Sequence, residues 1–143
     1  MIVTDPFEKC FGHQLRRCSA MMSSDLVRAT RAVDLKSAEA ATLFVIAANP
    51  GQSQITTARL LDVRPANLVP HVAKLLQLGL VARKPGRGKA WVVTATAKGL
   101  KKAEKIGQLI DRHEARYQSR LEPAERDELL RLLLKLRGDD PPT

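Results

Sequence analysis

Aromatic residues are scarce in this sequence of 143 residues: they make up 3% of it, although hydrophobic residues reach 44%. A core with so few aromatic rings must be built from Leu, Val, Ile and Ala, which suits packed helices better than a β-sandwich. Cys10 and Cys18 are too few and too close for a disulfide framework, so we expect reduced thiols. The composition therefore predicts a mostly helical protein that does not depend on disulfides.

Long hydrophobic runs, targeting signals and enzyme motifs are also missing. No apolar run approaches the roughly 20 residues of a transmembrane helix, and the N-terminal residues lack the layout of a signal peptide. The sequence has no GxGxxG, P-loop, HExxH or GxSxG pattern, and His13, His71 and His113 lack metal-ligand spacing. These absences predict a soluble, cytoplasmic protein that is not an enzyme and holds no cofactor or metal.

Acidic residues are rare in one stretch of the chain. Between positions 53 and 105, eleven Lys and Arg stand against two acidic residues, which accounts for the whole formal charge of +9. A basic region this concentrated predicts an anionic partner, either nucleic acid or an acidic membrane surface. The alternative is a solvated face that keeps the protein in solution.

Helical patterns occupy both ends of the chain. Apolar residues from Phe7 to Val33 recur every three or four positions and predict one long helix with an apolar seam. Ser37 can cap a second helix, with Ala40 at its third position instead of the Glu of a capping box. A helix from Pro123 to about Arg137 carries Leu on most sides, and too little chain remains to cover it, so we expect a dimer interface there.

Two short helices and a tight turn lie in the middle of the basic stretch. Ser53 can cap a helix from Gln54 to about Leu61, with Ile55 and Ala58 facing inward. A second helix begins near Pro65 and ends at Gly79. On this second helix we expect an inward face of Leu68, Val72 and Leu75 and an outward face of Asn67, Pro70, His71 and Lys74. The pair is typical of a helix-turn-helix.

A basic hairpin and a long helix follow. The strand-like runs Leu80-Val81-Ala82 and Trp91-Val92-Val93 flank the turn Pro85-Gly86-Arg87-Gly88. Thr96 can cap the long helix, and Gly107 within it marks a close crossing with another helix. Four cations surround the turn: Arg83, Lys84, Arg87 and Lys89.

The order and spacing of these motifs resemble the MarR family of winged-helix transcriptional regulators over nearly the whole chain. The similar stretches are NPGQSQITTARLLDVRPANLVPHVAKLLQLGLVAR, TATAKG and LEPAERDELLRLLLKL. The resemblance implies a mostly α fold with a small β-hairpin wing: a dimerisation helix in 1–36, a winged helix-turn-helix in 37–95, and dimerisation helices with a short tail in 96–143. It also implies a homodimeric repressor on pseudo-palindromic double-stranded DNA in the nucleoid, released by a small apolar or phenolic effector, with no membrane partner.

The resemblance assigns roles to particular side chains. Base or phosphate contacts fall to the recognition helix, namely Arg64, Asn67, Pro70, His71 and Lys74. Arg87 and Lys89 at the wing tip suit a narrow minor groove, and Arg83 and Lys84 suit the phosphates beside it. A phosphate can also meet the N-terminus of the preceding helix at Ser53, Gln54 and Thr56. Dimer contacts fall to Phe7, Phe11, Leu15, Tyr117, Leu121, Leu129, Leu133 and Leu136.

Two features depart from the family pattern, and three alternatives stay open. The wing has Arg87-Gly88-Lys89 where the family usually has an Asp beside Arg, and Pro70 interrupts the recognition helix, either as a contact to a thymine methyl or as a kink. Relatives that sense organic peroxide use a thiol in the first helix, held by tyrosines; this chain has Cys10 and Cys18 there but only Tyr117. The alternatives are a thiol-based regulator, a non-specific architectural DNA-binding protein and a protein-interaction module.

Overall fold

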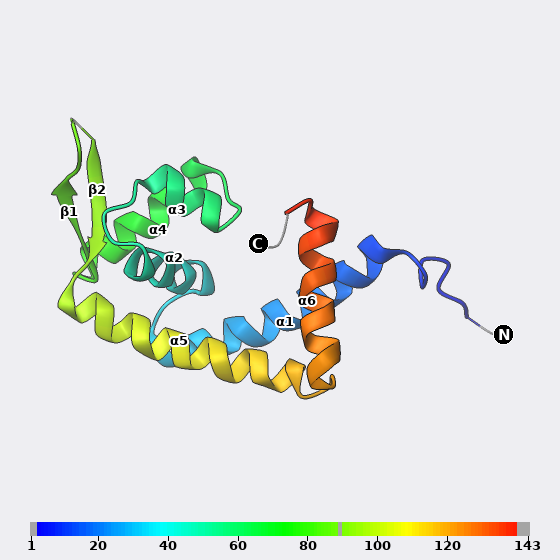
Figure 1. Ribbon diagram of the computed structural model, residues 1–143. Helices are drawn as coiled ribbons and strands as arrows, with labels where there is room; N and C mark the ends of the chain where they lie inside the picture. The colour runs from blue at the N-terminus through cyan, green and yellow to red at the C-terminus, as the bar shows by residue number, and fades with distance from the viewer. Residues whose placement is uncertain (1–2, 89, 140–143) are drawn as a thin grey trace. The chain divides into compact units, whose positions relative to one another are not determined.

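The computed structural model describes residues 3–88 and 90–139, so the predicted wing residue Lys89 lies outside the described residues. Within them the chain forms six α-helices, one short 3-10 helix and one two-stranded antiparallel hairpin (Figure 1). The backbone falls into two compact units that divide after Leu109. No helix of the described part is long and apolar enough to cross a membrane. The predicted mostly helical fold with a hairpin is confirmed, whereas the three predicted segments stay a prediction.

The first helix, α1, spans Phe11–Thr30 and continues into the 3-10 helix η1, Arg31–Val33. The prediction that it begins at Phe7 is wrong. The Phe7 N–H donates to Asp5 Oδ1 over 2.9 Å, and Cys10 has an extended backbone at φ −85 and ψ 118, so this stretch turns before the helix starts. The bond from Phe7, followed by contact with His13, holds the pKa of Asp5 below its ordinary value.

Helix α2, Ser37–Ala48, has a different N-terminus from the predicted one. Lys36 is the capping residue and Ser37 is the first helical residue, so the third helical position falls on Glu39. The Lys36 N–H donates to Glu39 Oε2 over 2.9 Å. The predicted lack of a reciprocal Glu is therefore wrong, because counting from Ser37 placed the cap one residue too late.

The core of the first unit surrounds α2, which packs against α1, α4 and β2. It is aliphatic, as the scarcity of aromatic residues predicts, and its members include Val33, Leu35, Ala40, Leu43, Ile46, Ala58, Leu68, Val72, Leu75, Leu80, Val93 and Ile106. Helix α5, Ala97–Gln118, crosses α2 closely. A Cβ at Gly107 would lie 3.2 Å from Phe44 Cε2, which confirms the predicted close crossing.

The second unit contains the end of α5 and helix α6, Pro123–Arg137, whose bounds match the prediction. None of the described residues of α6 is buried, although Leu recurs around it. Leu129, Leu130, Leu132 and Leu136 are 45–61% exposed. Of the predicted dimer residues, Phe7, Phe11 and Leu15 are exposed too, whereas Tyr117 is already buried, with Arg120 5.0 Å from its ring centroid. The apolar surface of α1 and α6 is consistent with the predicted dimer, which stays a prediction.

Candidate nucleic-acid interface

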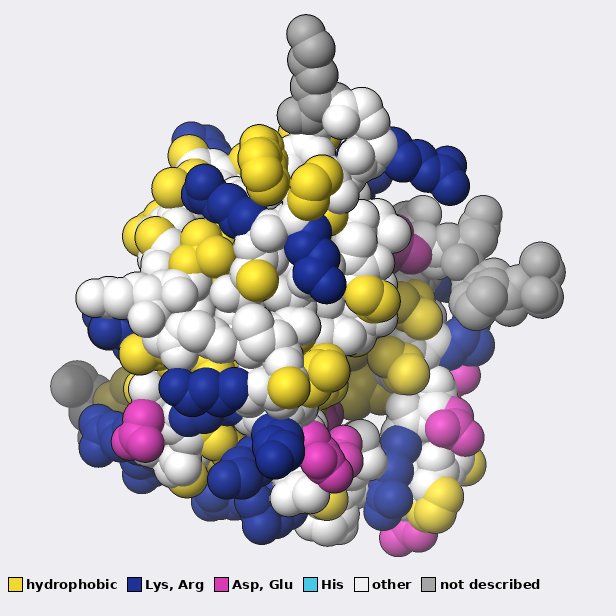
Figure 2. Space-filling model, turned by 90° about the vertical axis from the view of Figure 1, so that its left-hand side faces the viewer, with side chains coloured by type: hydrophobic (Ala, Val, Ile, Leu, Met, Phe, Trp, Pro, Cys, Tyr) yellow, Lys and Arg dark blue, Asp and Glu magenta, His cyan; other side chains and the backbone are white. Residues whose placement is uncertain are grey.

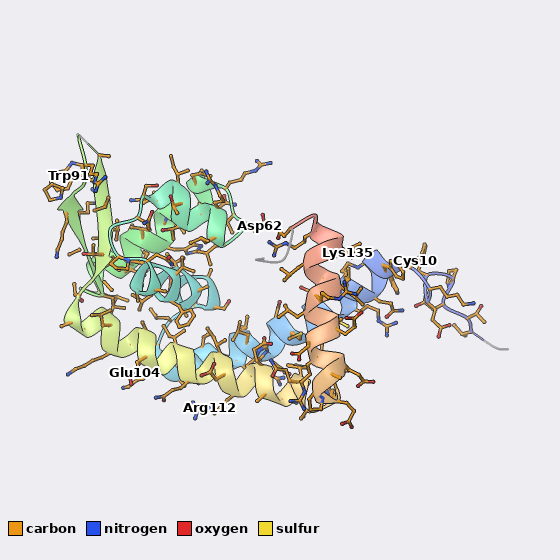
Figure 3. All side chains as sticks on the ribbon, viewed as in Figure 1. Cys10, Asp62, Trp91, Glu104, Arg112 and Lys135 are labelled. Carbon is orange, nitrogen blue, oxygen red and sulfur yellow. The ribbon has the colours of Figure 1, made fainter. Side chains whose placement is uncertain are left out.

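Helices α3, Gln54–Leu60, and α4, Pro65–Gln77, form the helix-turn-helix. Ser53 caps α3 as predicted, because its Oγ accepts the Thr56 N–H over 3.1 Å. Asp62 ends the helix with φ +53, a conformation that Asp tolerates better than most residues. Asp62, labelled in Figure 3, donates its N–H to the Arg59 carbonyl. The Val63 N–H donates to the Ala58 carbonyl, and the two bonds close the turn.

Helix α4 presents the predicted faces. Leu68, Val72 and Leu75 are at most 2% exposed, whereas Asn67, Pro70 and Lys74 are exposed and His71 is half-buried. The helix is continuous through Pro70. On α3 the prediction for Ile55 is wrong: its side chain is 62% exposed, because the buried side of this short helix is taken by Thr57 and Ala58.

The hairpin is longer than predicted. Strands β1, Val81–Pro85, and β2, Trp91–Ala95, pair from Val81 opposite Ala95 to Pro85 opposite Trp91. At the tip the Gly86 N–H donates to the Ala90 carbonyl over 2.8 Å, and a Cβ on Gly86 would lie 2.8 Å from Val92 Cγ1. A side chain at position 86 would lie too close to Val92, so the base of the turn requires glycine.

The hairpin root is attached to the end of α4 by four residues that we call the root clamp: Gly79, Leu80, Thr96 and Gly99. Thr96 Oγ1 donates to the Gly79 carbonyl over 2.7 Å and accepts the Gly99 N–H over 3.1 Å. The Thr96 N–H donates to the Leu80 carbonyl over 3.0 Å. The root clamp therefore fixes the wing to the recognition helix without the acidic residue that the sequence lacks.

Exposed cations extend from the helix-turn-helix to the wing. We call Arg64, Lys74, Arg83, Lys84 and Arg87 the basic set. None of the basic set forms an ion pair with a residue in the described ranges, in contrast to Arg28 and Arg131, which pair with Asp25 and Glu128. Figure 2 shows the side that carries the hairpin, where Lys and Arg lie among hydrophobic side chains. Charges on α4 and the hairpin that have no ion-pair partner among the described residues leave their electrostatic attraction available to an external anion.

Comparisons with known proteins identify solved structures that share this geometry. No family model matches the chain. CouR, a transcriptional repressor solved on a 23-mer DNA duplex, is 25% identical and covers 96% of this chain and 99% of its own, with a TM-score of 0.85. The MarR family protein Rv2887 of Mycobacterium tuberculosis, solved with DNA, is 27% identical over 88% of this chain and 96% of its own, with a TM-score of 0.72. These matches confirm the resemblance to the MarR family of regulators.

Other comparisons add context. A protein of Thauera aromatica, named "Putative transcriptional regulatory protein for hcr operon", is 34% identical to this chain over 103 residues. That alignment spans 71% of this chain and 62% of the relative. Structures of Rv2887 with salicylic acid and p-aminosalicylic acid, and of CouR with p-coumaroyl-CoA, also match.

One exposed aromatic residue was missed by sequence reasoning. Trp91, at the start of β2, is 64% exposed and points away from α3 and α4 near the hairpin tip (Figure 3). The sequence contains a signal for it, because the only Trp of the chain stands two residues after Lys89, beside the basic turn. The predicted phosphate site at Ser53, Gln54 and Thr56 is half-buried, and Ser53 Oγ is already engaged in capping, so that site stays a prediction.

The two thiols, Cys10 and Cys18, are exposed and free. Cys10 precedes the first residue of α1 and Cys18 lies within it. Eight residues of helix separate positions by about 12 Å, beyond the roughly 7 Å between Cα atoms that a disulfide spans. The two thiols therefore cannot form a disulfide within one chain while α1 is intact. The predicted redox role of either thiol is untested.

An open hollow of about 830 Å³ lies beside the helix-turn-helix. Its lining comes from the end of α1, η1, the linker that follows it, the start of α2 and one residue of α4, namely Val27, Arg31, Asp34, Leu35, Lys36, Ser37, Glu39 and Lys74. Three cations, Arg31, Lys36 and Lys74, outnumber the two acidic residues Asp34 and Glu39 in this lining. With the apolar Val27 and Leu35, they suit a ligand with a hydrophobic body and an anionic group. Sequence analysis predicted no such site, because Lys74 joins the segment 27–39 only through the tertiary fold.

Proposed function

We propose that this chain is a homodimeric repressor of transcription that binds double-stranded DNA in the cytoplasm, on the nucleoid, and is released by a small aromatic acid. The observation that carries the proposal is the unpaired basic set on a helix-turn-helix and a clamped wing. DNA-bound CouR and Rv2887 share this fold and support the assignment. Two recognition helices related by a two-fold axis require half-sites about 10 bp apart.

The test of DNA binding is a footprint on the region upstream of the gene that encodes the protein. The full chain is used at about 0.15 M salt, with random duplex as competitor. We expect a protected window of about two helical turns with internal two-fold symmetry. Protection that random duplex removes at equal concentration would refute sequence-specific binding and favour a non-specific architectural protein.

The hollow gives the effector a site. Arg31, Lys36 and Lys74 supply positive charge, and Val27 and Leu35 supply apolar surface. Rv2887 is solved with salicylic acids and CouR with an aromatic acyl-CoA, which supports this ligand class. Because Lys74 belongs both to the hollow and to the basic set, an acid bound there competes with a DNA phosphate for the same ammonium group.

Calorimetric titration with salicylate, against benzyl alcohol as an uncharged aromatic control, tests the hollow. We expect salicylate binding that Lys36→Gln weakens about tenfold, the effect of losing one charge-assisted hydrogen bond. Lys9→Gln, on an exposed residue outside the hollow, is the matched control. Binding that Lys36→Gln leaves unchanged would remove the hollow as the effector site without affecting the DNA-binding proposal.

A further inference from the structure

The exposed face of α4 is poor in hydrogen-bonding groups. Successive residues of a helix are 100° apart, so Ala66, Pro70 and Ala73 lie opposite the buried Leu68, Val72 and Leu75. All three are exposed, and Val69 on the flank is 57% exposed. We call Ala66, Val69, Pro70 and Ala73 the apolar strip. Gln77 continues this face only at the last residue of the helix.

The polar residues of α4 lie along one edge of the apolar strip. On the same 100° spacing, Asn67, His71 and Lys74 share that edge. Asn67 and Lys74 are exposed and His71 is half-buried. The strip itself offers no side-chain donor or acceptor, and Pro70 also lacks a backbone N–H. Hydrogen bonds to base edges can therefore come from one edge of the helix, but not from its centre.

Cations at both ends of α4 identify the occupant of this apolar face. Arg64 caps the first turn and Lys74 lies in the last one; both are exposed and unpaired within the described residues. Such cations hold a helix against phosphates on either side of a groove. A protein partner would leave them unmatched unless it were acidic. Charge complementarity therefore favours a duplex as the occupant.

We infer that the apolar strip recognises thymine C5-methyl groups in the major groove, an inference that rests on the proposed function because it needs α4 in that groove. The thymine methyl is the apolar group that base edges present there, and Ala and similar side chains contact it. The small side chains of Ala66 and Ala73 also allow the helix backbone to approach the bases closely. The half-sites of this protein therefore contain thymines opposite the strip, in addition to any base that Asn67 contacts.

The experiment removes one methyl group at a time. The full chain first selects its sites from a pool of random duplexes. The selected duplex is then synthesised with deoxyuridine in place of one thymidine, which deletes the methyl group and keeps the O4 acceptor. Affinity is measured by fluorescence anisotropy. We expect about fourfold weaker binding for each contacted methyl group, the equivalent of about 0.8 kcal/mol, at one or more thymines of each half-site.

Variants connect the methyl groups to the strip. Val69→Ala should weaken binding to the thymine duplex and lose the preference over the uracil duplex at one position, as in a double-mutant cycle. Pro70→Ala, which restores a backbone N–H and favours helix, is the second strip variant. Asn67→Ala is the matched control on the same helix, and it should weaken binding while the methyl preference remains. Circular dichroism checks that each variant keeps its helical content.

The outcomes separate the inference from the proposed function. A selected site whose uracil duplexes all bind as tightly as the thymine duplex overturns the inference and leaves the repressor standing. A methyl preference that survives when Ala66, Val69, Pro70 and Ala73 are all replaced by Ser in one variant also overturns it, because another element must then contact the methyl groups. A selection that enriches no sequence refutes the proposed function, and the inference with it.

Discussion

Substitution of Lys84 by Ala should reduce the salt dependence of DNA binding by a calculable amount. Lys84 lies on β1, is exposed, and forms no ion pair with any described residue. Its ammonium group is therefore free to neutralise a phosphate. Each neutralised phosphate contributes about −0.9 to the slope of log affinity against log salt.

The magnitude follows from the basic set. Five cations in each protomer give at most ten phosphate contacts for a dimer, and hence a slope of about −9. Lys84→Ala removes two contacts for each dimer, which changes the slope to about −7.2. Between 50 and 200 mM salt the wild-type protein should then lose affinity by a factor of about 3 × 10⁵, and the variant by about 2 × 10⁴.

Fluorescence anisotropy of a labelled operator duplex over this salt range measures the slope. Arg131→Ala is the matched control, because Arg131 lies on α6 and already pairs with Glu128. Its slope should equal that of the wild type. A Lys84→Ala slope equal to the wild-type slope would mean that β1 does not approach the phosphates, and the placement of the wing on DNA would be wrong.

Three further predictions use other parts of the molecule. Gly99→Ala would place a Cβ 1.8 Å from the Leu80 carbonyl oxygen, so it should lower the free energy of unfolding by about 2 kcal/mol or more and Tm by about 6 °C or more. Gly12→Ala is the control, because nothing lies within 4 Å of its new Cβ. Equal melting temperatures for the two variants would contradict the close contact at Gly99. The fluorescence of Trp91, the only Trp, should change on operator binding, and identical spectra would place the hairpin outside the interface. Leu136→Glu, at a 60% exposed position, should raise the dimer dissociation constant at least about 100-fold in sedimentation; an unaffected dimer would exclude α6 from the interface.

The helix-turn-helix could be predicted because single residues near each helix end determine where the helix begins and stops. Ser53 caps, Pro65 begins and Gly79 ends the two helices, and each acts within a few residues of its own position. The bounds of α6 follow in the same way from Pro123 and Gly138. Local signals of this kind do not need the rest of the chain to be known.

The errors come from choices between neighbouring local options. Both Ser37 and Lys36 could precede α2, and the bond from the Lys36 N–H to Glu39 decides between them. Periodicity extended α1 to Phe7, but the bond to Asp5 favours a turn there. Ile55 is apolar, yet a helix as short as α3 has room for only a narrow buried face.

The candidate site was predictable in its residue types but not in its connections. The recognition-helix and wing cations follow from charge and spacing, whereas the root clamp joins the end of α4 to residues seventeen positions later. The hollow likewise joins Lys74 of α4 to the segment 27–39. Contacts between distant segments depend on tertiary packing, which periodicity does not encode.

The root clamp has a consequence for how the binding specificity of this protein can change. Because Thr96 bonds to the carbonyl of Gly79 and to the amide of Gly99, the hairpin cannot shift on α4 without breaking bonds at both ends. Helix α4 and the hairpin therefore move as one rigid unit. In the proposed dimer, release from DNA therefore comes from a change in the spacing of two such units or from competition for Lys74, and in both cases the preferred half-site stays the same while its occupancy changes.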